Sequence, residues 1–449
     1  MSLLHLEARN LATALLDGEW LKTDLLERVA ISWGRKQRWQ RGLINRILAA
    51  FRDKPKTRAR KELIAFIESD DGFRSGLRRQ SLGPPRNLRI RWITPVMAPV
   101  ASAASWNVPA IITTTALAEW LGLTCDELNW FADCLGQEAR VKSSKLRHYT
   151  YRWLPKRGGK WRLLEVPKSR LKAIQRKILR EILNRIPVHI AAHGYCAGRS
   201  IVSFAAPHCG KSIVLRFDLR HFFPSVPGSR VHALFTTTGY PTEVARLLTG
   251  LCTNVVPDHV WALNPAATQS PVSSKDRERY RSPHLPQGAP TSPALANLCA
   301  RRLDIRLHAL AQTAGAIYTR YADDLAFSGG LDLEQSLRRF RMLVCQIAVE
   351  EGFAINLHKS RFMGQGVRQE LTGIVVNAHT NTRRADFDLL KAILTNCARN
   401  GPESQNRDGR ADFRGHLLGR IAHVGLVNAG RGKKLRELFE RIVWKAESP

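Results

Sequence analysis

Two adjacent aspartates, Asp323 and Asp324, stand between two short runs rich in aromatic and apolar residues, 317–321 and 325–330. Such runs are typical of β-strands, and the aspartates are predicted to form the tight connection between them. Two carboxylates side by side at a hairpin tip repel each other, so a plain turn gains little from them. A divalent cation would remove that repulsion. The hairpin therefore predicts a metal site, and the rest of the chain must supply its other ligands.

The charge of the chain indicates a polyanionic partner. Lys and Arg total 70 against 38 Asp and Glu, a formal charge of +32 over 449 residues. An excess of this size favours nucleic-acid binding over a merely soluble basic protein. The length predicts two or three domains. The eight cysteines include no CxxC pair, which is typical of reduced thiols in the cytoplasm, and no apolar run is long enough to span a membrane.

Residues 1–105 are predicted to form a basic helical unit. Between residues 35 and 91 there are 17 Lys and Arg against 5 Asp and Glu, with aromatic residues among them. Cationic heads beside aromatic rings suit phosphate contact and base stacking, whereas the alternative is a solvated basic face. The aromatic residues considered are Trp33, just before this stretch, and Trp39 and Phe51 within it. The candidate nucleic-acid ligands are Arg35, Lys36, Arg38, Arg58, Arg60 and Lys61.

The remaining pattern alternates strands and helices. The predicted strands cover a hairpin at 149–167 with a basic Gly-Gly tip, a buried strand at 212–219, a strand at 353–362 with Lys359 near its end, and a strand at 370–377. The predicted helices cover 11–26, 168–186, 294–310, 333–351 and the tail 385–449. Thr124 and Glu127 form a predicted capping box. Residues 254–284 are expected to be an insertion or mobile loop.

Histidines and cysteines gather between residues 189 and 209. A metal site there is conceivable, but no Glu follows His189, so the zinc-protease pattern is missing. Hydrogen bonding within loops is the favoured interpretation for these side chains, which are His189, His193, Cys196, His208 and Cys209.

Five motifs follow one another along the chain: FDLRHFF (217–223), LPQGAPTSP (285–293), YADD (321–324), NLHKSR (356–361) and LTGIVVN (371–377). Their order and spacing resemble those of reverse transcriptases, over roughly residues 110–449. Within that family the chain most resembles the bacterial retron type. The segments that carry this resemblance are LPQGAPTSPALAN, YTRYADDLAFSG, LTGIVVN and HGYCAGRSIVSFAAPHCGKS (193–212).

The resemblance implies an α+β right-hand polymerase fold with fingers, palm and thumb, and an additional basic helical N-terminal domain. The expected boundaries are 1–105 for the N-terminal extension, 106–211 for the fingers, 212–384 for the palm with its insertion near 254–284, and 385–449 for the helical thumb.

The resemblance also implies a catalytic centre with two Mg²⁺ ions, for which Mn²⁺ could substitute. Asp218 and Asp323 are the expected direct ligands, helped by the Leu219 carbonyl, and Asp324 is expected to support one metal or the primer end. Around them, Phe223 would close off the sugar 2′ side and Gln287 would contact the incoming nucleotide. Further expected contacts are Arg162, Lys156 and Lys160 to the triphosphate, Lys359 as the acid for the leaving pyrophosphate, and Thr372 and Gly373 to nucleic acid. The alternatives without a role in catalysis are that Phe223 is a core aromatic residue and that Lys359 is an exposed lysine at a strand end.

A retron enzyme would copy part of its own structured noncoding RNA from deoxynucleoside triphosphates. It would prime from a 2′-hydroxyl, leave a branched RNA–DNA hybrid, and act with a separate effector protein in anti-phage defence in the bacterial cytoplasm. The alternatives are a group II intron-type or abortive-infection-type reverse transcriptase, and a non-catalytic RNA-binding scaffold. Only 65 residues follow residue 384, which is short for a maturase region plus an endonuclease. The three aspartates argue against a scaffold, because RNA binding alone does not need clustered anions.

Overall fold

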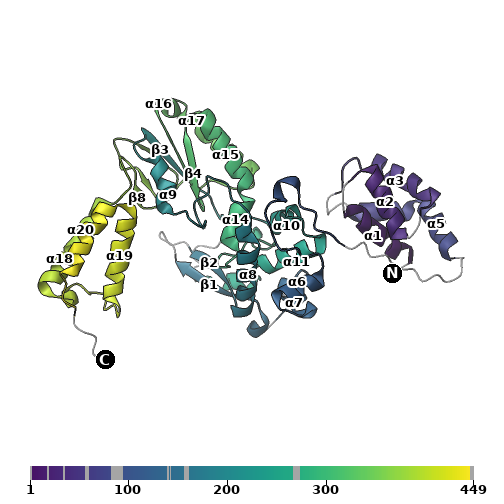
Figure 1. Cartoon of the computed structure of the whole chain (residues 1–449), viewed down its shortest axis with the longest axis horizontal. Helices are drawn as coiled ribbons and strands as arrows, with labels where there is room; N and C mark the ends of the chain where they lie inside the picture. The colour runs from purple at the N-terminus through teal and green to yellow at the C-terminus, as the bar shows by residue number, and fades with distance from the viewer. Residues whose placement is uncertain are drawn as a thin grey trace. The chain divides into compact units, whose positions relative to one another are not determined.

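The computed structural model describes residues 3–17, 20–33, 36–55, 60–81, 95–138, 141, 143–155, 161–265 and 274–444. It divides the chain into two units (Figure 1). The first comprises residues 1–99, 110–117 and 239–245, and the second comprises the remainder. Within the described residues, none of the helices has both the length and the apolar character needed to cross a bilayer.

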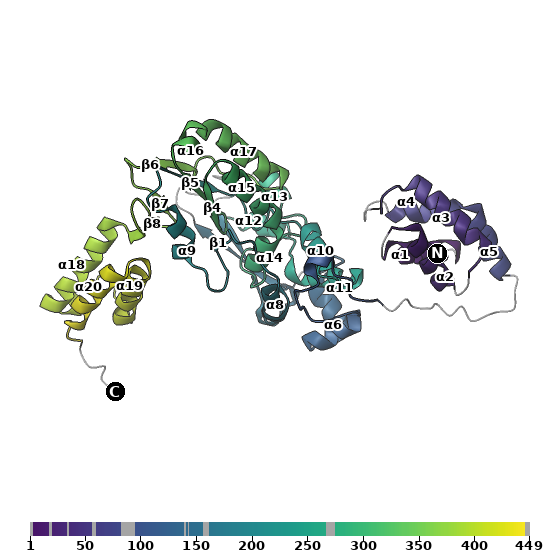
Figure 2. The same ribbon diagram turned by 45° about the horizontal axis from the view of Figure 1, so that its top comes forward.

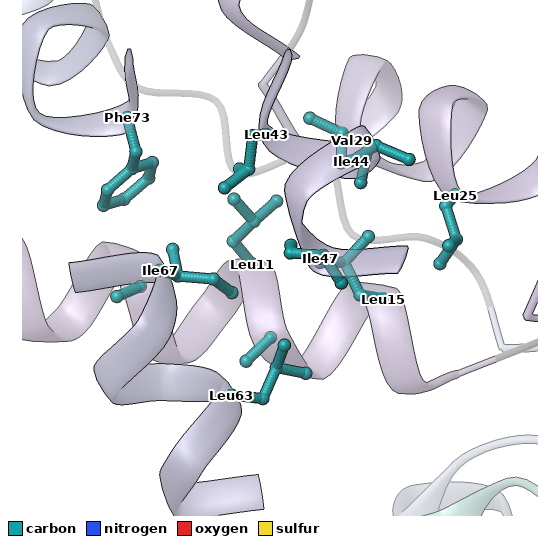
Figure 3. Packing of buried hydrophobic residues seen from close by; sticks show 12 residues of the cluster. Leu11, Leu15, Leu25, Val29, Leu43, Ile44, Ile47, Leu63, Ile67 and Phe73 are labelled. Atoms are coloured by element: carbon teal, nitrogen blue, oxygen red, sulfur yellow. The ribbon is translucent and has the colours of Figure 1, made fainter. Parts of the chain in front are cut away.

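The first unit begins with five helices, α1 (Leu3–Leu16), α2 (Lys22–Trp33), α3 (Arg38–Ala50), α4 (Arg60–Ser69) and α5 (Asp71–Ser81). Apolar residues at helical spacing point inward and form one core, which Figure 3 shows from close by. The expectation of one helix over residues 11–26 is wrong, because Leu15 belongs to α1 and Leu25 to the separate helix α2.

The aromatic residues of this unit pack against its core. The rings of Trp33 and Trp39 meet edge to face at 4.9 Å, and both contact Phe73. Phe51 lies edge to face with Phe66 at 5.7 Å. In the protein alone, these rings are therefore engaged with one another rather than presented for base stacking.

A four-stranded antiparallel sheet lies at the centre of the second unit, with strand order β4-β5-β3-β6. Its strands are β3 (Ile213–Asp218), β4 (Ile317–Tyr321), β5 (Asp324–Gly329) and β6 (Arg361–Gly364). Nearly every residue of β3 and β5 is buried, and each of these strands has a hydrogen-bonded neighbour on both sides. The strand predicted at 353–362 is wrong in extent, and Lys359 lies in a turn before β6.

The predicted hairpin at 149–167 is confirmed as β1 (Tyr149–Pro155) paired with β2 (Trp161–Pro167). The long helix that follows is α8 (Ser169–Glu181). The predicted capping box is also confirmed: Thr124 caps α7 (Cys125–Ala132), and its Oγ1 accepts from the Glu127 amide.

The flanks of the expected insertion at 254–284 are structured where the chain is described. They contain α12 (His259–Ala262) and α13 (Ser274–Glu278). Val260, Trp261 and Tyr280 are buried and pack with Leu163 of β2. Residues 266–273 lie outside the described residues.

The helix predicted at 294–310 is two helices, α14 (Ser292–Cys299) and α15 (Arg301–Thr313), which meet at Ala300. The helix predicted at 333–351 is α17 (Leu337–Glu350), preceded by a short α16 (Leu331–Gln335). The segment 370–377 is not one strand, because it turns at Thr372 and Gly373, both with positive φ. It forms β7 (Glu370–Leu371) and β8 (Ile374–Val375), and β9 (Asn381–Thr382) pairs with β8.

The tail is helical as predicted, with α18 (Arg384–Asn400), α19 (Phe413–Val427) and α20 (Ala429–Glu440) packed around a shared apolar core. The remaining helices of four or more residues are α6 (Thr114–Leu121), α9 (Ile201–Ala205), α10 (Gly228–Thr237) and α11 (Thr242–Cys252). Figure 2 shows the same elements after a turn about the horizontal axis.

Candidate active site

The strand register places three aspartates together at one end of the sheet. Asp218, the last residue of β3, is paired directly with Asp324, the first residue of β5. Asp323 lies in the turn between β4 and β5, and its carbonyl accepts from the Leu219 amide at 2.8 Å. The turn residues are Ala322 and Asp323, one position earlier than the sequence predicts. Asp324 is consequently a strand residue with a fixed cross-strand partner.

Arg216 binds Asp324 from the neighbouring strand, a contact that sequence reasoning did not find. Residues 216 and 218 share one face of β3 because side chains alternate along a strand. The Arg216 Nη2 lies 2.7 Å and 3.0 Å from the two Asp324 carboxylate oxygens, and its Nε lies 2.9 Å from Oδ1. Burial raises the pKa of Asp324 to about 6, although the Arg216 guanidinium opposes that rise. Arg216 therefore both orients Asp324 and partly neutralises it.

Asp218 is bound from the segment before β6. The Lys359 Nζ donates to Asp218 Oδ1 at 2.8 Å, and the Asn356 Nδ2 donates to Oδ2 at 3.2 Å. The backbone N–H of Asn356 also donates to the backbone carbonyl of Asp218 at 2.7 Å, which fixes the turn that carries Lys359. The Asp218 side chain is 7% exposed, whereas that of Lys359 is 61% exposed. Lys359 can therefore leave Asp218 without unpacking the core.

The carboxylates suit a divalent cation in kind, since hard cations prefer oxygen ligands. Burial and the charge of Asp218 raise the pKa of Asp323, and the charges of Lys359 and Arg162 oppose that rise. An added cation would relieve the same unfavourable charge. Among the residues that the structure describes, however, no three His, Cys, Asp or Glu side chains are gathered to hold a metal ion. Two of the carboxylates, Asp324 and Asp218, are instead bound by Arg216 and Lys359.

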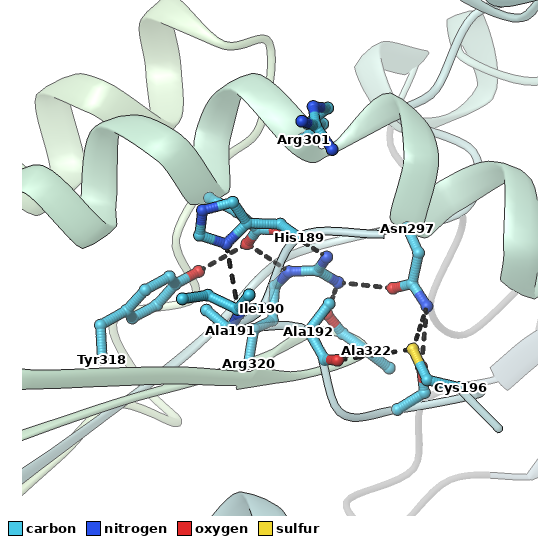
Figure 4. A network of polar contacts seen from close by, with 12 residues as sticks. His189, Ile190, Ala191, Ala192, Cys196, Asn297, Arg301, Tyr318, Arg320 and Ala322 are labelled. Carbon is cyan, nitrogen blue, oxygen red and sulfur yellow. Dashed lines mark hydrogen bonds and ion pairs between the residues drawn. The ribbon is translucent and has the colours of Figure 1, made fainter. Parts of the chain in front are cut away.

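A buried ion pair anchors the turn that carries Asp323. Arg320 and Asp304 are both fully buried, and the Arg320 Nη2 lies 2.6 Å from Asp304 Oδ2. The Arg320 Nη1 donates to Asn297 Oδ1 at 2.9 Å and to the Ala322 carbonyl at 3.1 Å (Figure 4). Ala322 has φ of 54°, in the left-handed region that side chains disfavour. The hydrogen bond from Arg320 thus holds a strained turn in place.

Gly194 packs against the backbone of the same turn. A Cβ built on Gly194 would lie 2.7 Å from the Ala322 amide nitrogen, closer than real contacts allow. The neighbouring His193 amide donates to the Arg320 carbonyl at 2.7 Å. The loop around residue 194 can therefore pack directly on the backbone of the turn only because this residue is glycine.

Phe223 lies beside a second aromatic residue that sequence reasoning missed. The ring of Tyr195 is 6.4 Å from that of Phe223 and 6.4 Å from that of Tyr321. Tyr195 is 56% exposed and has φ of 59°. Burial and the nearby charge of Asp323 raise the pKa of its phenol. Phe223 is half-buried and packs on Phe222, so it borders the site rather than lying in the core.

Gln287 is held by the strand β2. The Gln287 carbonyl accepts from the Glu165 amide at 3.0 Å, and a Cβ on Gly288 would lie 2.8 Å from the Glu165 carbonyl oxygen. The buried Glu165 carboxylate accepts from Asn254 Nδ2 at 2.7 Å and lies 3.1 Å from His284 Nε2. This pair joins β2 to the segment that leads into Gln287.

The Glu165–His284 pair predicts a pH dependence of stability. Burial lowers the pKa of His284, but the charge and hydrogen bond of Glu165, together with the hydrogen bond to the Ser282 carbonyl, more than offset this, so the net shift is upward. A raised folded pKa gives stability that is fully present below about pH 6.5, the unfolded pKa, and lost as pH rises through the folded pKa. Thermal unfolding from pH 6 upward is expected to show this loss at about 1.4 kcal/mol per unit of pKa difference. The Glu165→Gln variant should lack that slope, and an identical slope in both proteins would exclude the pair as its source.

The remaining predicted ligands lie at separate places. Arg162 is exposed on β2, and Thr372 and Gly373 form the turn between β7 and β8. In the first unit Lys36, Arg38 and Lys61 are exposed, and Arg60 donates to Thr13 Oγ1 at 2.7 Å. Four predicted ligands lie outside the described residues, namely Arg35, Arg58, Lys156 and Lys160.

The histidines between 189 and 208 make hydrogen bonds within the described fold. His208 is buried between Ser328 Oγ and Thr319 Oγ1, each at 2.7 Å, and burial lowers its pKa to about 3. His193 lies 2.9 Å from Ser203 Oγ, and burial lowers its pKa to about 4. These contacts agree with the hydrogen-bonding interpretation.

Comparison with known proteins assigns this geometry to a family. The family model described as "Reverse transcriptase (RNA-dependent DNA polymerase)" matches residues 154–380, which contain all three aspartates. The Retron Mx65 reverse transcriptase of Myxococcus xanthus is 36% identical over 379 residues, which cover 84% of this chain and 81% of that protein.

Two further relatives cover less of the chain. The Retron Mx162 reverse transcriptase of Myxococcus xanthus is 39% identical over 71% of this chain and 64% of that protein. The Retron Ec86 reverse transcriptase of Escherichia coli is 32% identical over 52% of this chain and 63% of that protein. The matched segment contains this sheet, and the chain is an RNA-directed DNA polymerase. The chain belongs to the reverse transcriptase family and, within it, to the retron type.

Proposed function

We propose that this reverse transcriptase copies part of a structured noncoding RNA of its own retron into single-stranded DNA. Synthesis would start from a 2′-hydroxyl of that RNA and leave a branched RNA–DNA hybrid. The product would act with a separate effector protein in anti-phage defence in the bacterial cytoplasm. The observation that carries the catalytic part is the pairing of Asp218 with Asp324 beside Asp323, in a chain similar to retron enzymes.

The three aspartates are the proposed holders of two Mg²⁺ ions, with the Leu219 carbonyl as an additional ligand and Mn²⁺ as a substitute. Bound there, the ions would activate the primer hydroxyl and neutralise the triphosphate and leaving pyrophosphate. Arg216 supports this assignment for the chain itself, because its three hydrogen bonds fix the orientation of the Asp324 carboxylate.

Lys359 is proposed to have two positions. In the structure it neutralises Asp218, and its 61% exposed side chain is free to turn toward a bound triphosphate. There an ammonium group could protonate the departing pyrophosphate oxygen. Arg162 and Gln287 are proposed to bind the triphosphate and the base and sugar of the incoming nucleotide. The turn at Thr372 and Gly373 is a proposed nucleic-acid contact.

The four-part division into an N-terminal extension (1–105), fingers (106–211), palm (212–384) and thumb (385–449) is likewise proposed. The central sheet supports the palm, and the three packed helices α18, α19 and α20 support the thumb. The exposed cations Lys36, Arg38 and Lys61 of the first unit support RNA binding by the extension.

Phe223 is proposed to exclude ribonucleotides, which gives a direct prediction. Replacing Phe223 with Ala should lower the preference for deoxynucleotides about 10- to 100-fold, because a steric barrier to the 2′-hydroxyl is removed while other contacts remain. The ratio of kcat/KM for a deoxynucleotide and the matching ribonucleotide measures it. Phe223→Tyr keeps the ring and serves as the control. An unchanged ratio in the Ala variant would assign Phe223 to packing alone.

Expression with the native locus tests the retron assignment. Nucleic acid purified with the protein should contain one branched species that both RNase and DNase shorten. Its amount should fall to background in cells carrying the Asp323→Asn, Asp324→Asn double variant. Unbranched or untemplated DNA would favour the group II intron-like or abortive-infection-type alternative, and RNA without DNA would favour the scaffold.

A further inference from the structure

A cavity outside the aspartate site is lined almost wholly by cations and apolar side chains. It has a volume of about 470 Å³ and lies between α8 and the turn that joins α6 to α7. The helices α6, α7 and α8 are near one another in Figure 1. The turn contributes residues 121–123, and α8 contributes residues between 170 and 180. Its cations are Arg170, Arg176, Lys177 and Arg180, and its apolar residues are Leu121, Leu123, Ala173 and Ile174.

Four cations line the cavity, and two carboxylates, Glu127 and Glu181, pair with two of them. Lys177 donates to the Trp120 carbonyl and lies 5.0 Å above the Trp120 ring, which fixes its ammonium group at the wall. Arg170 is paired with Glu127 at 2.5 Å, and Arg180 with its neighbour Glu181 at 2.8 Å. Arg176 is exposed and has no carboxylate partner among the residues that the structure describes. The cavity consequently carries a net positive charge.

We propose that this cavity binds an unpaired nucleotide of a folded RNA, with the base against the apolar wall and its phosphates on the α8 cations. The volume falls in the range of sites that enclose a small molecule, and it is more than a bare phosphate needs. Proteins recognise folded RNA mainly through unstacked bases that are turned out of helices. A continuous duplex keeps its bases stacked inside and could offer only its backbone.

The spacing along α8 suits a bent strand that enters and leaves the cavity. Lys177 and Arg180 are three residues apart, about 4.5 Å along the helix axis, so they can share one phosphate. Arg170 lies seven residues before Lys177, about 10.5 Å along the axis, where it can reach a neighbouring phosphate. The inference rests on the proposed function only in taking RNA as the ligand, and it gives that RNA a second anchoring point.

Two variants of the full chain test the proposal by different routes. Arg176→Glu with Arg180→Glu reverses the charge of exposed residues, and Ala173→Trp fills the cavity without changing the charge. The matched control is Arg338→Glu with Arg339→Glu, an exposed pair on α17. Fluorescence anisotropy measures binding of a labelled RNA hairpin with a single-stranded uridine tail, and of a blunt RNA duplex, at two salt concentrations. Thermal unfolding midpoints verify folding.

The charge reversal is expected to weaken binding of the tailed hairpin about 10- to 100-fold and to reduce its salt dependence, because phosphate contacts are lost. Ala173→Trp is expected to weaken the tailed hairpin about 10-fold, with little effect on the duplex, because only base docking is lost. The control should stay within about 3-fold, since its charges contact the RNA only non-specifically. An equal loss of affinity in the control variant would overturn the proposal. So would an Ala173→Trp variant that binds the tailed hairpin as tightly as the parent protein does. Unchanged RNA affinity in both cavity variants would also overturn it, and would leave a protein as the occupant of the cavity.

Primer extension on a short annealed DNA primer and RNA template separates this proposal from the proposed function. Both cavity variants should extend it like the parent protein, because no cavity residue belongs to the aspartate site. Loss of extension in the parent protein would contradict the proposed function, whereas loss confined to the cavity variants would contradict the separate binding site.

Discussion

Replacing Asp323 with Asn is expected to reduce deoxynucleotide incorporation at least about 1,000-fold. This corresponds to about 4 kcal/mol of transition-state stabilisation, the size of effect that metal-ion catalysis supplies. The substitution keeps the shape of the side chain and removes a charge that the proposed Mg²⁺ site requires. Single-nucleotide extension on a saturating primer and template measures the loss. The control is Asp332→Asn, an exposed carboxylate on α16.

The same variant should not lose stability. Burial and the charge of Asp218 raise the pKa of Asp323, which means that its ionised form is unfavourable in the metal-free fold. The thermal midpoint without metal should therefore stay the same or rise, while addition of Mg²⁺ should stabilise the parent protein more than the variant. Undiminished incorporation would contradict the catalytic assignment, and a lowered midpoint would attribute the loss to unfolding.

Replacing Arg320 with Met is expected to lower the free energy of unfolding by about 3–5 kcal/mol. The substitution leaves Asp304 as an unpaired charge in a fully buried place, where the penalty for breaking an ion pair is of this size. It also removes the donor to the Ala322 carbonyl, so the turn that carries Asp323 loses its anchor. Urea denaturation measures the change.

A second substitution distinguishes charge burial from packing. Arg320→Met with Asp304→Leu removes both charges and should recover most of the lost stability, because apolar pairs can replace a buried ion pair. Activity should nevertheless stay low in the double variant, since the hydrogen bond to Ala322 is still missing. A loss below about 1 kcal/mol for Arg320→Met would show that the ion pair does not anchor the turn.

Local sequence patterns predicted those strands and helices whose signal lies within one short stretch of the chain. The alternation around Tyr149 and the buried run before Asp218 became strands, and the capping signal at Thr124 became a helix start. The errors in predicted helix bounds lie where apolar residues keep their helical spacing across a point at which one helix ends and the next begins. Ala300 interrupts α14 and α15 although leucines continue at helical spacing on both sides, so periodicity alone could not show the break.

The motif order predicted the aspartates, but not what surrounds them. Arg216 and Asp324 are 108 residues apart and meet only through the β3–β5 register. The Glu165–His284 pair spans 119 residues, and no periodic signal links the two positions. A buried arginine such as Arg320 is also unpredictable from composition, because charged residues are almost never fully buried unless they are paired. Such partners become visible only when the fold brings distant segments together.

The contacts of the aspartates have a consequence for the order in which the protein acquires activity. Asp218 and Lys359 are separated by 141 residues, and the turn at Ala322 packs on Gly194, far earlier in the chain. Contacts between distant segments form late, since the intervening chain must first lose its freedom. During synthesis, Asp218 leaves the ribosome well before the segment that carries its partner Lys359 exists. Nucleotide transfer is therefore a property of the finished fold, and a nascent fragment that ends before Lys359 would be inert.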